Sequence, residues 1–256
     1  MFELYFYLPA LALGLIVGSF LNVVIHRLPR GRSTVSPTSG CPYCGSAIRA
    51  HDNLPLLSYL LLRGRCRRCS APISWRYPLI EALTAALFVA CIARFGPSFE
   101  AAAAAIFCAL LVALAAIDAE HFLLPDKITL PGIFVGLALQ PYLPDATILE
   151  AVLGVLIGAG ALILLINFWY WLREEEGMGL GDVNMLAMIG AFLGWKGAAV
   201  TLAAGALLGA FTGLILMIPG KLEARSRLPF GVFLAVGALL ALFFGRHWIE
   251  FYSRLL

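Results

Sequence analysis

Residues 148–171 read ILEAVLGVLIGAGALILLINFWYW, a run of 24 residues in which Glu150 is the only charge. As an α-helix rising 1.5 Å per residue, this run would be about 36 Å long, which exceeds the roughly 30 Å hydrocarbon core of a bilayer. The whole chain has the same character, since 61% of its 256 residues are apolar, 13% are charged and the mean hydropathy is +0.91. So few charges cannot cover a water-soluble surface, and we expect lipid to be the solvent for most of the chain.

Comparable apolar runs recur along the chain and predict an all-α polytopic membrane protein with about eight transmembrane helices. The predicted spans are 3–25, 78–95, 99–118, 128–143, 148–171, 183–195, 197–218 and 229–247. The sixth is short, which suits a helix buried among others better than one facing lipid. Glycines in the fifth and seventh spans predict close packing of helix backbones; they are Gly154, Gly158, Gly160, Gly205, Gly209 and Gly213.

Basic residues are concentrated in one segment, which predicts the orientation. Residues 27–77 hold nine arginines and one acid, Asp52. A nucleic-acid-binding patch is one interpretation, but in a membrane protein such residues indicate a loop kept in the cytoplasm. We therefore expect this segment inside, the N-terminus outside and no nucleic acid as a partner. The first run is not expected to be a cleaved signal peptide, because it begins with Glu3 instead of a basic segment and stays apolar through Ile25.

Two CxxC pairs lie in the arginine-rich segment, Cys41-Pro-Tyr-Cys44 and Cys66-Arg-Arg-Cys69. Two such pairs can present four thiolates to one tetrahedral metal, and their spacing is close to that of zinc-ribbon-like sites. Disulfides or plain reduced thiols are the alternative, but disulfides need an oxidising compartment and the arginines place this loop in the cytoplasm. The segment has little apolar core, so a closed structural zinc site would help it fold. Cys91 and Cys108 lie in predicted spans, where they are expected to be buried small residues.

The predicted domains follow from these features. They are 1–26, a first transmembrane helix; 27–77, a small cytoplasmic zinc-ribbon-like module; and 78–256, a transmembrane core.

Two aspartates lie where predicted spans meet the cytoplasm. Asp118 ends the apolar run 106–117, and Asp182 follows Gly179 and Gly181 at the start of the sixth span. Carboxylates at such depth usually indicate a site, and two that share a proton can activate a water against a peptide carbonyl. The glycines would let the backbone approach an extended substrate closely. An aspartate at a helix end is also commonly an N-cap or an interfacial residue, so the residues alone leave both interpretations open.

Six stretches of the sequence, in order, resemble the bacterial type IV prepilin peptidases, which are GxGD aspartic proteases. They are GSFLNVVIHRLPRG (18–31), CPYC (41–44), DNLPLLSYLLLRGRCRRC (52–69), ISWRYPLIEALT (73–84), AAIDAEHFLLPDKITLP (115–131) and EEEGMGLGDVNMLAMIGAFLGWKG (174–197). The resemblance covers nearly the whole chain.

This resemblance implies an integral inner-membrane enzyme that removes the leader peptide of prepilins or pseudopilins, in type IV pilus or type II secretion systems. It also implies N-methylation of the new N-terminus with S-adenosylmethionine as methyl donor, and makes 78–256 the peptidase core. The family's catalytic aspartates map onto Asp118 and Asp182, the latter in the GxGD motif with Gly179 and Gly181. Its metal-binding cysteines map onto Cys41, Cys44, Cys66 and Cys69. One departure is Asn184, where many relatives are expected to have lysine.

The mechanism expected from these residues has one aspartate as general base on a water, while the other, protonated, polarises the scissile carbonyl. Asp126 is expected to be the N-cap of the fourth span, and Glu81 either serves methyl transfer or pairs with Arg76. The sequence has no GxGxxG motif after a strand, so methyl transfer rests on the resemblance alone.

Two alternatives remain open from the residues. A non-enzymatic membrane scaffold or ion-coupled transporter with a zinc docking module would show ion flux and no proteolysis. A peptidase that lacks the methyl-transfer step would leave the mature pilin N-terminus unmethylated.

Overall fold

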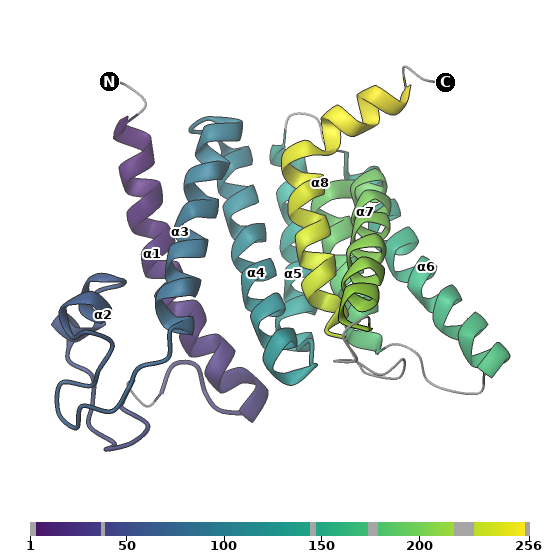
Figure 1. Cartoon of the computed structure of the whole chain (residues 1–256). Coiled ribbons are helices and arrows are strands. Elements are labelled where there is room, and N and C mark those ends of the chain that lie inside the picture. The colour runs from purple at the N-terminus through teal and green to yellow at the C-terminus, as the bar shows by residue number, and fades with distance from the viewer. Residues whose placement is uncertain (1–3, 37–38, 144–146, 174–178, 218–227, 254–256) are drawn as a thin grey trace. The chain divides into compact units, whose positions relative to one another are not determined.

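The computed structural model describes residues 4–36, 39–143, 147–173, 179–217 and 228–253 (Figure 1). The chain divides into two compact units, Met1–Ala113 and Leu114–Leu256. The described residues are helical apart from loops and two isolated β-bridges, which confirms the all-α fold. The helices are α1 (Leu4–Arg27), α2 (Leu57–Leu61), α3 (Arg76–Phe95), α4 (Phe99–His121), α5 (Asp126–Leu139), α6 (Ile148–Arg173), α7 (Leu180–Met217) and α8 (Phe230–Ser253), with short 3-10 turns at Leu28–Arg30, Ala50–Asn53 and Gln140–Tyr142.

Within the described ranges, five helices are long and apolar enough to cross a membrane, namely α1, α3, α4, α6 and α7. They confirm a multi-pass membrane protein but do not confirm a total of about eight spans. Helix α5 has only 14 residues, and the apolar part of α8 at Phe230–Gly245 is also shorter than these five. The predicted sixth and seventh spans are joined in α7.

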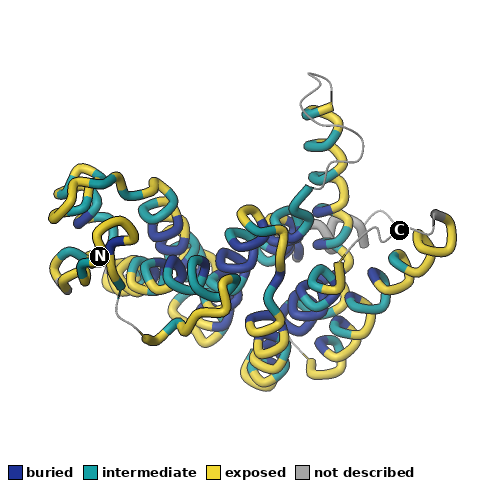
Figure 2. Tube along the Cα trace, turned by 90° about the horizontal axis from the view of Figure 1, so that it is seen from below, coloured by how far each residue is buried: buried dark blue, intermediate teal, exposed yellow. Residues whose placement is uncertain are grey.

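Exposed residues run along the helices of both units (yellow in Figure 2). Many of them are large and apolar, for example Leu164 at 72% exposed and Phe211 at 64%. Apolar side chains so exposed along whole helices would be unfavourable in water, whereas lipid solvates them. The exposure pattern is therefore that of helices with lipid-facing sides.

Glycines set the distance between helices, as their abundance predicts. A Cβ on Gly154 of α6 would clash with the carbonyl oxygen of Gly190 in α7, so these backbones touch. Gly158 and Gly205 are similarly close to α7 and α8 backbone, and in the first unit Gly14 and Gly18 of α1 lie against α3. The other predicted glycines do not touch a neighbouring backbone: Gly209 and Gly213 meet only side chains, at 3.4 and 3.5 Å, and Gly160 has nothing within 4 Å of its Cβ position.

Helix α7 is two helices joined at Gly194, whose φ of 69° and ψ of −179° are not helical. The first half packs against α6, with Gly190 beside Gly154, and the second half packs against α8, with Gly205 beside Phe233. The chain therefore turns back at Gly194, within two residues of the predicted boundary between spans.

The break in α7 leaves carbonyl groups that the next turn of helix would otherwise bond. The side-chain amide of Gln140, which is 2% exposed, donates to the carbonyls of Ala191 at 2.7 Å and Phe192 at 3.3 Å. A helix that breaks inside a membrane requires hydrogen-bond partners for the carbonyl groups that the break frees. Gln140 thus holds the turn of α7 in place.

Gly154 and Gly160 allow a matched test of this packing within one helix. We expect Gly154→Ala to lower the thermal unfolding temperature of the purified protein, because overpacking a close contact costs about 1–3 kcal/mol. Gly160→Ala should leave that temperature unchanged or raise it slightly, because alanine favours helix by about 1 kcal/mol over glycine. Equal melting temperatures for the two variants would contradict this packing.

Candidate active site and metal site

Asp118 lies in the last turn of α4 and is 5% exposed. Its carboxylate accepts a hydrogen bond from the backbone N–H of Val232 at 3.3 Å, and the N–H of Gly231 also contacts it. Both donors belong to the first turn of α8, where N–H groups have no partner within the helix and favour a negative charge. The start of α8 therefore binds and orients this carboxylate.

Gly231 is required for this contact and is a site residue that the sequence analysis missed. A Cβ at this position would lie 2.9 Å from the carboxylate oxygen Oδ2 of Asp118 and 3.0 Å from the side chain of Leu124. Any larger residue would push Asp118 away from the N–H groups of α8. The sequence offers only a weak indication of this role, a glycine just after Pro229 at the start of a span.

Asp182 is the third residue of α7, and its backbone N–H donates to the carbonyl of Gly179 at 3.2 Å. Its carboxyl group is partly buried, contacts the N–H of Gly179 and lies within electrostatic range of Asp118. The structure therefore brings the two predicted aspartates together at one end of the second unit.

The two glycines of the GxGD motif have different surroundings. A Cβ on Gly181 would lie 2.9 Å from the side chain of Leu124, so this glycine lets α7 approach the connection between α4 and α5. A Cβ on Gly179 would meet nothing closer than 3.9 Å. Of the two, only Gly179 has room beside it for an approaching chain.

Leu124 lies in the connection that follows Asp118 and contacts the starts of both α7 and α8. This connection begins at Phe122, whose φ of 51° turns the chain sharply and whose N–H donates to the Asp118 carbonyl at 2.9 Å. The buried Leu124, 7% exposed, then packs against Gly181 and Gly231. One short connection thus positions the helix ends that carry both aspartates.

The four cysteines of the first unit come from two loops with the same backbone geometry. In the first loop, Cys41 N–H donates to Ser46 and Gly45 N–H donates to Cys41. In the second loop, Cys66 N–H donates to Ala71 and Ser70 N–H donates to Cys66. Each loop also closes with an isolated β-bridge, Gly40 to Ala47 and Arg65 to Pro72. Each CxxC pair therefore forms a tight turn that directs both thiols to one side.

The Sγ atoms of Cys41, Cys44, Cys66 and Cys69 all lie within 4.8 Å of one another, and those of Cys41 and Cys69 are 3.7 Å apart. Tetrahedral zinc with bonds of about 2.3 Å places its sulfur ligands about 3.8 Å apart. A disulfide would need a separation of about 2.05 Å, and all four cysteines are free thiols. The arrangement fits a four-thiolate metal site.

Electrostatics at these thiols favour a cation. The hydroxyl and backbone N–H of Ser46 lower the pKa of Cys44 to about 6, and the backbone N–H groups of Cys69 and Arg68 lower the pKa of Cys66. The N–H of Ala71 favours the Cys69 thiolate, yet desolvation and the other thiols raise the pKa of Cys69 to about 12. Four thiolates this close repel one another, and a bound divalent metal removes that repulsion.

Asp52 and Arg67 fasten the second cysteine loop to the preceding 3-10 turn. The Arg67 guanidinium donates to both carboxylate oxygens of Asp52, at 2.6 and 3.0 Å. The hydrogen bonds and positive charge of Arg67 lower the pKa of Asp52.

The remaining cysteines, Cys91 and Cys108, are fully buried side by side, as expected for small core residues.

Comparison with known proteins identifies the family of the chain. Residues 12–95 match the bacterial peptidase A24 N-terminal domain, and residues 105–214 match the type IV leader peptidase family. A prepilin leader peptidase/N-methyltransferase of Burkholderia pseudomallei (strain 1026b) is 43% identical over 92% of this chain and 84% of its own length. The chain belongs to the type IV leader peptidase family.

Other members of the family are similar over almost their full length. Proteins with the same name from Aeromonas hydrophila and Pseudomonas aeruginosa PAO1 are 41% and 38% identical, each over 94% of this chain and 91% of the relative. No solved structure matches the chain. Membership of this family makes the protein an enzyme, which excludes the purely structural scaffold as its main role.

Asn184, the departure from the expected family pattern, has a defined partner. Its side-chain amide donates to Oδ1 of Asp126 at 2.9 Å. The prediction that Asp126 caps the fourth span is wrong, because α5 begins at Asp126 itself, its N-cap is Pro125 and no side chain caps it. The carboxylate is directed to α7 instead. Asn184 therefore ties the start of α5 to the first turns of α7, two residues from Asp182.

A double-mutant cycle tests this link. We expect Asn184→Ala and Asp126→Ala each to lower peptidase activity several-fold, because the start of α7 loses its anchor. The double variant should be no worse than either single variant, since interacting residues are not additive. Asn184→Lys should retain activity, because an ammonium can pair with Asp126. Peptidase rates that fall additively would contradict the link.

Proposed function

We propose that this membrane peptidase removes the leader peptide of type IV prepilins or pseudopilins, with Asp118 and Asp182 as its catalytic pair. The observation that carries the proposal is the approach of the two carboxylates at one end of the second unit, in a chain of the type IV leader peptidase family. Its relatives are named prepilin leader peptidase/N-methyltransferase.

In the proposed mechanism, one aspartate takes a proton from a water that attacks the scissile carbonyl. The other, protonated, donates to the carbonyl oxygen, so that a pair of carboxyl groups with one proton performs both tasks. The N–H groups of Gly231 and Val232 hold Asp118 in position throughout. The open side of Gly179 is where the extended substrate would pass next to Asp182.

We place this site at the cytoplasmic face of the inner membrane. The arginines of 27–77 favour retention of that segment in the cytoplasm, which puts the N-terminus outside. The leader of a prepilin would then lie in the cytoplasm and its apolar helix in lipid, with the junction at the aspartates. The partners are prepilin substrates and membrane lipid, and the arginines serve orientation instead of nucleic-acid binding.

We also propose that Cys41, Cys44, Cys66 and Cys69 bind a structural zinc ion within a cytoplasmic module, residues 27–77, between the first helix and the peptidase core of 78–256. The proximity of four thiols on two matching turns supports this assignment. Zinc is favoured because a closed four-thiolate site stabilises a segment with little apolar core.

The relatives' name supports N-methylation of the newly exposed N-terminus as a second activity, with S-adenosylmethionine as the donor. This donor supplies an electrophilic methyl carbon. When bound, it would supply that methyl group to the amine of the new N-terminus.

Replacing each aspartate tests the catalytic assignment. We expect Asp118→Asn and Asp182→Asn to lower the rate of prepilin cleavage at least about 100-fold, because general acid–base catalysis contributes a factor of that order. The measurement is leader removal by purified protein, followed by mass spectrometry.

The control is Glu150→Gln, at the start of α6 beside the Gly194 turn. It should cleave normally. All variants should insert in the membrane and hold one zinc per chain by elemental analysis. Cleavage retained by either aspartate variant would overturn the assignment, and zinc absent from the wild type would overturn the metal proposal.

Gly231→Ala tests the positioning of Asp118 by α8. Its Cβ would displace the carboxylate, and a displacement of about 1 Å lowers rates about 100-fold in well-oriented sites. We expect cleavage to fall about 10- to 100-fold. Gly245→Ala, in the same helix and with no atom closer than 4.0 Å to its Cβ, should cleave normally. Full activity in Gly231→Ala would show that α8 does not orient Asp118.

A further inference from the structure

Helix α2, in the segment between α1 and α3, has an exposed apolar side. Leu57, Leu60 and Leu61 are 58%, 70% and 79% exposed. Because they are spaced by three and four residues, they lie on one side of the helix, and we call them the leucine face. Leaving a leucine side chain in water instead of burying it costs about 1.5–3 kcal/mol. A group of three is therefore unfavourable unless an apolar partner covers it.

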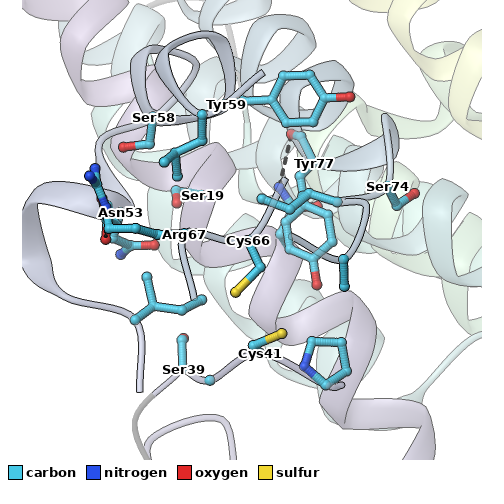
Figure 3. A pocket seen from close by; sticks show the side chains of 18 of the residues that line it. Ser19, Ser39, Cys41, Asn53, Ser58, Tyr59, Cys66, Arg67, Ser74 and Tyr77 are labelled. Carbon is cyan, nitrogen blue, oxygen red and sulfur yellow. Dashed lines mark hydrogen bonds and ion pairs between the residues drawn. The ribbon is translucent and has the colours of Figure 1, made fainter. Parts of the chain in front are cut away.

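The other side of α2 fixes the direction of the leucine face. The buried hydroxyl of Ser58 donates to the carbonyl of His51 at 3.1 Å and accepts the backbone N–H of Leu54 at 3.0 Å. Ser58 and Tyr59 also line a cavity of about 970 Å³, which is bounded by α1, the two cysteine loops and the start of α3 (Figure 3). The leucine face lies outside the lining of this cavity. Rotating α2 to cover its leucines would break the hydrogen bonds of Ser58.

A hydrogen bond to α3 sets the level of α2 along the membrane helices. The buried Glu81 accepts the backbone N–H of Leu56, directly before α2, at 2.8 Å. Glu81 lies about 7.5 Å along α3 from Arg76, at 1.5 Å per residue. The 20 residues of α3 are about 30 Å long, which matches the hydrocarbon core of a bilayer. The start of α2 is therefore level with a part of α3 that lies inside the membrane edge (Figure 1).

The surface of α3 at this level has the character of a lipid-facing surface. Leu79 and Leu83, which flank Glu81 in α3, are both exposed. Trp75, directly before α3, is also exposed, and tryptophan is enriched at the level of the lipid headgroups. Helices that lie in the membrane surface bury their apolar side about 5–10 Å below the headgroups. The leucine face lies at such a depth.

Two exposed arginines, Arg63 and Arg65, follow α2 in the chain. A guanidinium group can bond a phosphate with two parallel hydrogen bonds, while its apolar stem packs on acyl chains. Each basic residue near an anionic membrane surface contributes about 1 kcal/mol to binding. The charge next to the leucine face is therefore complementary to a phospholipid surface.

We propose that α2 is an interfacial anchor whose leucine face inserts among the acyl chains of the leaflet on the side of the cysteine loops. Arg63 and Arg65 then lie at the level of the lipid phosphates. In the proposed orientation this is the cytoplasmic leaflet. The anchor holds the segment 27–77 against the membrane at a point between α1 and α3. It does not depend on the peptidase or methyl-transfer proposals.

Val35 offers a control side chain at a different depth. It is apolar and exposed like the leucine face, and the carbonyl of its neighbour Ser33 accepts a hydrogen bond from the Arg27 guanidinium at 3.1 Å. The amide of Asn22 donates to the carbonyl of Tyr77 at 3.1 Å, so these residues of α1 and α3 are level. Arg27, at the end of α1, lies about 7.5 Å further along that helix, past the start of α3. Val35 is therefore on the aqueous side of the membrane edge.

Photo-crosslinking of the full-length protein tests the insertion. The photoreactive residue p-benzoylphenylalanine replaces Leu60 or, in the control, Val35, and the protein is reconstituted in vesicles of phosphatidylethanolamine and phosphatidylglycerol. We expect illumination to attach lipid to the Leu60 position several-fold more than to the Val35 position, as measured by mass spectrometry. Failure to attach lipid at Leu60 would overturn the proposal. A covalent dimer of the chain, or a prepilin adduct that replaces the lipid adduct when prepilin is added, would also overturn it.

Charged substitutions provide a second measurement, the thermal unfolding temperature in the same vesicles. Leu60→Glu should lower this temperature, because a carboxylate is unfavourable among acyl chains. Leu60→Lys should lower it less, since the long stem of lysine lets the ammonium reach the phosphates. Val35→Glu should unfold like the wild type. An unchanged temperature in Leu60→Glu, or an equal decrease in Leu60→Glu and Val35→Glu, would overturn the anchor and leave the peptidase proposal standing.

Discussion

Lipid offers no hydrogen bonds to a polypeptide backbone, and this constraint shapes the molecule. Each spanning segment that the structure describes is a helix that bonds its own N–H and carbonyl groups, so partners from outside the helix are needed at its ends and breaks. Where α7 breaks, Gln140 bonds the freed carbonyls of Ala191 and Phe192. Where α8 begins, the N–H groups of its first turn bind the Asp118 carboxylate. The hydrogen bonds that satisfy the first N–H groups of α8 therefore also orient the Asp118 carboxylate.

Glycine makes this arrangement possible because it lets helix ends approach without a Cβ between them. Gly181 and Gly231 bring the starts of α7 and α8 against Leu124, and Asp182 lies within electrostatic range of Asp118. In the first unit, Gly18 places α1 against α3 so that Asn22 and Glu81 line one cavity. In both units, close backbone contacts therefore bring polar side chains together.

The candidate metal site depends on loop geometry instead of helix packing, since its two cysteine loops lie outside the long helices. Two matching CxxC turns direct four thiols to one point, and their mutual repulsion is relieved by a cation. The same loops form part of the wall of the cavity in the first unit. A metal that orders them would also order that wall.

The sequence by itself determined the helical membrane fold and the family, and it indicated the two aspartates and the four cysteines as candidate site residues. These depend on local composition and spacing, because an apolar run or a CxxC pair is recognisable without knowledge of its neighbours. The number of membrane spans could not be predicted from the sequence, since hydropathy does not distinguish a short helix such as α5 from a helix that crosses the whole membrane. Only the tertiary structure decided that Asp126 bonds Asn184, that Gly231 supports Asp118 and that Glu81 bonds Leu56. Each of these contacts joins residues far apart in the chain, and their meeting depends on how the helices pack.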